Sequence, residues 1–118
     1  MGAKLIAVIG HTRCGAITGS IDNAELGNLT ALLGRIRPAV ESTLADRPPG
    51  IPAGSEDKKF VEEVARANAR LAMRQIREQS PVLRSLLESE IEKERIGLVG
   101  GMYNLATGKV TFFEVQNC

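Results

Sequence analysis

The chain has 118 residues, with 15 Lys and Arg residues against 14 Asp and Glu residues, and two cysteines. This charge balance gives no electrostatic reason to expect a nucleic-acid partner or a membrane partner, and no apolar run approaches the roughly 20 residues that a membrane-spanning helix needs. Two cysteines cannot make a disulfide framework, which predicts a reduced, cytoplasmic protein. The length predicts a single domain over residues 1–118.

The first expected element is a short strand. Residues 4–9 are apolar after Lys4, a pattern typical of a strand buried on both faces in a parallel sheet. Gly10 ends this strand. The tight connection that follows leads into a short helix over residues 16–21.

A longer helix and a loop are expected next. Asn28 is the expected N-cap of a helix over residues 29–44, with apolar residues on one face. Pro38 predicts a new turn or a kink within it. Residues 47–54 are rich in proline and glycine and predict a surface loop, which we interpret as an excursion within one domain.

Two further helices are predicted after this loop. The longest helix of the chain is expected to open near Ser55 and to end at about Gln79. Ser80 followed by Pro81 is the pattern of an N-cap with proline at the first helical position. It predicts another short helix, whose apolar residues reach Ile91.

The chain is expected to end in a β-hairpin. Residues 96–103 form a second apolar strand, Thr107 and Gly108 supply the turn, and residues 110–115 form the closing strand. A strand, several helices and a hairpin in this order predict an α/β fold with few strands.

The residues that carry chemistry concentrate after the first strand. His11, the only histidine, precedes Cys14 by three residues, at the carboxyl end of the strand where open α/β sheets place ligands. Imidazole nitrogen and thiolate sulfur are the donors that zinc prefers. Gly15 lets the backbone approach a metal or an anion without a Cβ in the way. The pair alone leaves both a metal site and a purely structural role open.

The sequence resembles the C-terminal half of a β-class carbonic anhydrase. Residues 4–16 are similar to the strand and zinc loop of that family, an apolar strand followed by Gly-His-[Ser/Thr]-x-Cys-Gly-Ala. Asn68 with the apolar helix after it, then residues 80–83, are similar to the family's helical region before its last strands. Residues 96–103 and 107–110 are similar to its final hairpin, so the resemblance covers the chain in the correct order.

This resemblance implies a zinc ion held by His11 and Cys14, a substrate-binding region at Gly15, and the reversible hydration of carbon dioxide to bicarbonate. The family's first zinc ligand lies in a Cys-x-Asp-[Ser/Thr]-Arg motif on an earlier strand, and its Asp and Arg form the catalytic dyad. The sequence contains no such motif, and Cys118 is the last residue. No catalytic residue is therefore assigned, and the zinc site is expected to be incomplete.

The expected architecture is a truncated β-carbonic anhydrase-like parallel sheet with flanking helices and a C-terminal hairpin. Without the family's first strands, the strand at residues 4–9 becomes an exposed edge, which favours self-association into a homo-oligomer. Three functions stay open. The chain is a carbonic anhydrase homologue with little or no activity alone, a non-catalytic zinc-binding or interaction module, or a relative acting on carbon disulfide or carbonyl sulfide.

Overall fold

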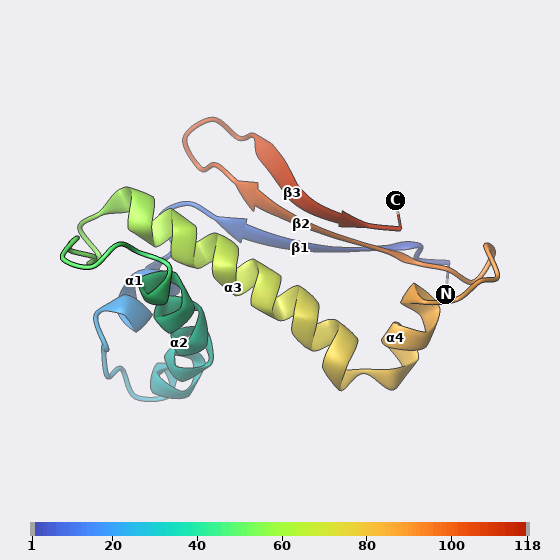
Figure 1. Cartoon of the computed structure of the whole chain (residues 1–118), viewed down its shortest axis with the longest axis horizontal. Coiled ribbons are helices and arrows are strands. Elements are labelled where there is room, and N and C mark those ends of the chain that lie inside the picture. The colour runs from blue at the N-terminus through green and yellow to red at the C-terminus, as the bar shows by residue number, and fades with distance from the viewer. Residues whose placement is uncertain (1, 118) are drawn as a thin grey trace.

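The computed structural model describes residues 2–117. A three-stranded sheet has the order β1-β2-β3, with β1 parallel to β2 and β3 antiparallel to it (Figure 1). This confirms the predicted α/β fold and the C-terminal hairpin. The elements in chain order are β1 (Leu5–His11), α1 (Gly15–Ile21), α2 (Leu29–Ala45), α3 (Lys58–Gln79), α4 (Pro81–Leu87), β2 (Gly97–Tyr103) and β3 (Val110–Gln116).

The helices lie on one side of the sheet, and α3 runs along it (Figure 1). Phe60 and Val64 of α3 and Leu98 of β2 are completely buried. One core cluster joins α1, α2 and the first half of α3, and a second joins Met73, Leu87, Ile96 and Leu98. Burial of this apolar surface is the main force that holds α3 to the sheet.

Glycine allows the close contact between sheet and helix. A Cβ on Gly100 of β2 would lie 2.6 Å from the sulfur of Met73 and 3.0 Å from the ring of Phe113. A Cβ on Gly10 of β1 would lie 2.8 Å from the sulfur of Met102. The absent side chain of Gly100 therefore lets Met73 of α3 approach the sheet closely.

The first strand is not buried on both faces, so that prediction is wrong. Side chains of β1 alternate between half-buried and exposed, and Leu5 and Ile9 are 52% and 42% exposed. The physical reason is that, among residues 2–117, β2 is the one strand that pairs with β1, and that the helices cover the opposite face (Figure 1). The expected exposed edge at this strand is confirmed.

Two helix boundaries also differ in detail from the prediction. Asn28 occupies the N-cap position of α2, but its side chain makes no capping hydrogen bond. Helix α4 ends at Leu87 rather than near Ile91, which is exposed. The segment after α4 is held in a turn instead, where Arg95 Nε donates to the Ser89 carbonyl at 2.7 Å. Pro38 lies inside α2, which continues through it without a break.

No helix within residues 2–117 is long and apolar enough to cross a bilayer.

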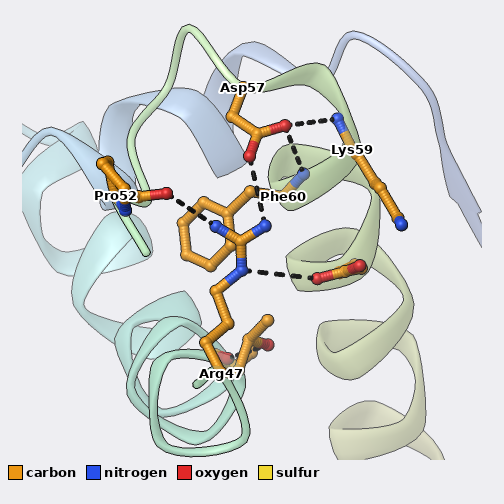
Figure 2. Close-up of polar contacts among 8 residues, drawn as sticks. Arg47, Pro52, Asp57, Lys59 and Phe60 are labelled. Atoms are coloured by element: carbon orange, nitrogen blue, oxygen red, sulfur yellow. Dashed lines mark hydrogen bonds and ion pairs between the residues drawn. The ribbon is translucent and has the colours of Figure 1, made fainter. Parts of the chain in front are cut away.

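Arg47 fastens the proline-rich loop between α2 and α3 (Figure 2). Its guanidinium donates to the Pro52 carbonyl at 2.9 Å and to the Asp57 carboxylate at 3.1 Å, and lies 3.9 Å from the Glu63 carboxylate. It also lies 4.8 Å from the centroid of the Phe60 ring, a cation–π distance. One side chain thus bonds the loop to the start of α3.

Asp57 links this contact to the start of α3. Its carboxylate accepts hydrogen bonds from the amides of Lys59 and Phe60 at 3.1 and 3.2 Å, the arrangement of a helix N-cap. The Phe60 amide, and to a smaller degree the Arg47 guanidinium, hold the pKa of the Asp57 carboxyl below its ordinary value of 3.8.

The lowered pKa makes the stability of the fold depend on pH. Because the folded pKa lies below the unfolded value of 3.8, ionised Asp57 stabilises the fold at pH values above that value, and this contribution is lost as the pH falls through the folded pKa. Asp57→Asn keeps a capping oxygen but removes the charge. We expect urea unfolding to show a deficit for Asp57→Asn at pH 7 that shrinks at pH 3. Glu56→Gln removes a neighbouring charge and should show no such pattern, and an equal deficit at both pH values would contradict the assignment.

Candidate metal site at the edge of the sheet

His11 is the last residue of β1 and lies at the carboxyl end of the strand. Its Nδ1 lies 2.8 Å from the carbonyl oxygen of Thr12. A carbonyl can only accept, so Nδ1 carries the proton and donates, and the Nε2 lone pair is left for another partner. Histidines that ligate metals commonly make this contact, because it fixes both the tautomer and the ring orientation.

Cys14 occupies the N-cap position of α1 and is half-buried with a free thiol. Its side chain makes no capping hydrogen bond. Its backbone carbonyl accepts from the amide and the hydroxyl of Thr18, both at 3.1 Å. The start of α1 is thus stabilised by the backbone of Cys14, while the sulfur takes no part in capping.

His11 and Cys14 line the same pocket, beside the free edge of β1. The pocket has a volume of about 180 Å³, and Asn68 of α3 is its third polar residue. The rest of the wall is apolar or glycine and consists of Val8, Ile9, Gly10, Ile17, Ala65, Ala69 and Ala72. The structure therefore brings the two predicted ligands to one small, mostly apolar site.

The donors in this pocket fit zinc in type but are too few. Zinc in proteins takes a tetrahedral shell of nitrogen, sulfur or carboxylate ligands. Within residues 2–117 no group of three or more His, Cys, Asp and Glu side chains is placed to hold a metal. Cys118, the other thiol of the chain, lies outside the described residues. The assignment of His11 and Cys14 as zinc ligands stays a prediction, and a full shell would need donors from outside residues 2–117.

Gly15 follows directly and opens α1. A Cβ built on it would meet nothing within 4 Å, so this position has open space around it. No contact within the described residues requires glycine here. The assignment of Gly15 to substrate binding stays a prediction.

A larger pocket on the other side of the same loop was not foreseen. It has a volume of about 380 Å³ and is lined by Thr12 and Arg13 together with residues from α1, the start of α3 and the β2–β3 hairpin. Only the tertiary fold brings these segments together, so spacing along the chain could not reveal them. Arg13 lines this pocket and is exposed.

The family assignment follows from comparison with known proteins. The model of the carbonic anhydrase family matches residues 1–110, nearly the whole chain. The chain therefore belongs to the carbonic anhydrase family, and the solved structures that it resembles are of the β class. None of the curated proteins matches it.

The solved structures that resemble the chain share its fold. The β-carbonic anhydrase CafA of Aspergillus fumigatus superposes with a TM-score of 0.73 at 22% identity, over 94% of this chain and 49% of that one. One of two tetrameric β-carbonic anhydrases of Sordaria macrospora superposes with a TM-score of 0.70 at 18% identity, over 98% of this chain and 53% of that one. The chain thus spans about half the length of these structures.

The hydrogen bond of His11 predicts its tautomer. We expect the neutral imidazole to carry its proton on Nδ1, because the Thr12 carbonyl accepts from that atom. Long-range nitrogen–proton NMR correlation above pH 8 distinguishes the two tautomers, and the chain has one histidine, so the signals need no assignment. Predominance of the proton on Nε2 would contradict this geometry. Added zinc should shift the Nε2 signal and leave Nδ1 protonated.

Proposed function

We propose that this chain contributes part of a β-class zinc centre for the reversible hydration of carbon dioxide to bicarbonate. The observation that carries the proposal is that His11 and Cys14 line one pocket at the free edge of β1. Donors beyond residues 2–117 are needed to complete the centre. The 118 residues alone are therefore expected to have little or no hydration activity.

The roles of the residues present follow from their chemistry. His11 offers Nε2, oriented through the bond from Nδ1 to the Thr12 carbonyl, and Cys14 offers a thiolate. The small apolar residues of α3 restrict the water that reaches these donors from the helix side. A zinc ion held in a complete site supplies a hydroxide at neutral pH by lowering the pKa of its bound water to about 7. The same donors would serve carbon disulfide or carbonyl sulfide as substrate.

A non-catalytic role is the second candidate. The incomplete donor set favours it, since a chain that keeps the fold can serve as a zinc-binding or interaction module. The two candidates differ in turnover rather than in fold. Location in the cytoplasm stays a prediction from the cysteine content.

Zinc binding and turnover test the proposal together. Zinc affinity is measured by competition with a chromophoric chelator, and hydration by stopped-flow with a pH indicator. We expect zinc to bind the isolated chain weakly, through His11 and Cys14, and turnover to be close to the uncatalysed rate. His11→Ala and Cys14→Ser should each weaken zinc binding by about tenfold or more, because loss of a direct ligand exceeds the roughly 10–100-fold cost of losing an outer-shell partner.

Cys118→Ser is the matched control, since it removes the other thiol of the chain. It should leave the zinc affinity unchanged, and loss of binding in this variant would show that Cys118 is a ligand. Stoichiometric zinc with full turnover would refute the incomplete site. Tight zinc without turnover would favour the non-catalytic module, and zinc binding that survives both His11→Ala and Cys14→Ser would overturn the assignment of the ligands.

We further propose that a second copy of the chain covers the open face of the sheet. Register and the alternation of side chains place these residues on that face: Leu5, Ala7, Ile9, His11, Gly97, Val99, Gly101, Tyr103, Val110, Phe112 and Val115. None of them is Asp, Glu, Lys or Arg, and Phe112 is 57% exposed, whereas Val99 is buried within the sheet. Two identical faces can therefore pack about a two-fold axis without burying a charge. The Sordaria macrospora proteins with this fold are tetrameric.

Sedimentation velocity tests this association. We expect the chain to form dimers or larger species at micromolar concentration, because the uncovered apolar surface is removed from water. Phe112→Ser with Val115→Ser should weaken association by about tenfold or more, since each buried side chain of this size contributes about 1.5–3 kcal/mol. Val82→Ser alters an apolar residue of α4 that is 70% exposed and should have no effect. A strictly monomeric wild-type chain would contradict the proposal.

A further inference from the structure

The larger pocket lies at the carboxyl ends of both parallel strands. Thr12 and Arg13 directly follow β1, and Asn104 directly follows β2. Open α/β sheets bind ligands in the crevice at this end of their strands. The volume of about 380 Å³ lies within the range of roughly 300–1,000 Å³ that small-molecule sites occupy.

The loop that forms one wall is held in place. The Thr12 amide donates to the Tyr103 carbonyl at 3.0 Å, and the Thr12 hydroxyl accepts from the Leu105 amide at 3.0 Å. Arg13 follows with a φ of +55°, a left-handed conformation that is uncommon outside glycine. The bonds of Thr12 thus fix the loop to the β2–β3 hairpin, and Arg13 extends from this fixed point.

The charged side chains of the pocket are unused by the fold. The side chains of Arg13, Lys58 and Glu62 form no hydrogen bond and no ion pair with any residue from 2 to 117. Two cations therefore face one carboxylate around the cavity. Asn104 accepts from the amides of Ala106 and Thr107 through Oδ1, at 2.9 and 3.3 Å, which leaves its Nδ2 group to donate.

The start of α3 does not itself supply the site. Lys58 and Glu62 lie on the first turns of this helix, but Asp57 already accepts hydrogen bonds from the amides of Lys59 and Phe60. An anion in the pocket cannot use those amides. Recognition would depend on the side chains of Arg13 and Lys58 and on the hydroxyl of Ser55, which also lines the cavity.

We propose that this pocket binds a small phosphorylated polyol, such as a sugar phosphate. Arg13 matches a phosphate through its planar, forked guanidinium, and Lys58 adds a point charge. Glu62 accepts hydrogen bonds from ligand hydroxyls, and Asn104 donates to them. A carboxylate beside two cations suits a ligand that carries both an anionic group and neutral hydroxyls, whereas it weakens the binding of a bare anion. This site is separate from the zinc ligands and does not depend on the hydration activity.

Glucose 6-phosphate, inorganic phosphate and glucose are the probes. Each is titrated into the full chain without added metal at about 0.1 M salt, by calorimetry and by amide NMR shifts. We expect saturable binding of glucose 6-phosphate with shifts at Thr12, Arg13, Ser55 and Asn104, weaker binding of phosphate, and none of glucose. Arg13→Ala with Lys58→Ala should weaken glucose 6-phosphate binding by about tenfold or more, because both cations that pair with the phosphate are lost.

Arg35→Ala with Arg84→Ala is the control, because it removes the same charge from exposed helix positions outside the pocket. Equal weakening in this control, or the absence of saturable glucose 6-phosphate binding at millimolar concentration, would overturn the site. Glu62→Ala separates the two parts of the ligand. It should strengthen phosphate binding but not glucose 6-phosphate binding, and equal strengthening of both would overturn the recognition of the polyol.

Discussion

Helix α3 packs directly against the parallel strands β1 and β2, and this contact places the rest of the structure. It is close because Gly10 and Gly100 stand where the strands meet the packed layer, and a Cβ on Gly10 would also lie 3.4 Å from the Ala65 carbonyl oxygen. The contact brings the carboxyl end of β1 beside the middle of α3, so His11 and Asn68 line one pocket. It also sets the first turns of α3 beside the loop after β1, where the larger pocket forms.

Because the helices cover only one side of the sheet (Figure 1), β1 has an exposed face and, among residues 2–117, an unpaired outer edge. Parallel strands are normally covered on both faces, yet one face of β1 exposes Leu5 and Ile9, and its outer edge pairs with no strand among residues 2–117. The pocket that holds His11 and Cys14 opens beside this edge with an incomplete set of donors. A further strand paired along β1 would satisfy this edge, and the proposed zinc centre needs its remaining donors beside the same edge.

Short sequence patterns predicted the helices and strands, but they did not predict the contacts between elements that are distant in the sequence. Ser80 followed by Pro81 marks the start of α4. The Ser80 hydroxyl oxygen accepts a hydrogen bond from the Leu83 amide at 3.2 Å, a local contact that the sequence alone can predict. That His11 and Cys14 meet in one pocket could be predicted because only three positions separate them along the chain. The position of Arg47 against Phe60 and the meeting of Arg13 with Lys58 depend on how α3 packs. The burial of β1 was misjudged because an apolar sequence does not reveal which neighbours are present to cover it.

The loop from His11 to Cys14 forms a wall of two different pockets. Its end residues line the small pocket at the sheet edge, and Thr12 and Arg13 line the larger one. The spacing of the two proposed zinc ligands explains why His11 and Cys14 share a pocket, whereas Thr12 and Arg13 between them line another. The bonds of Thr12 to Tyr103 and Leu105 and the left-handed turn at Arg13 fix the loop. Because the same few bonds hold both walls, the orientation of His11 and that of Arg13 are set together.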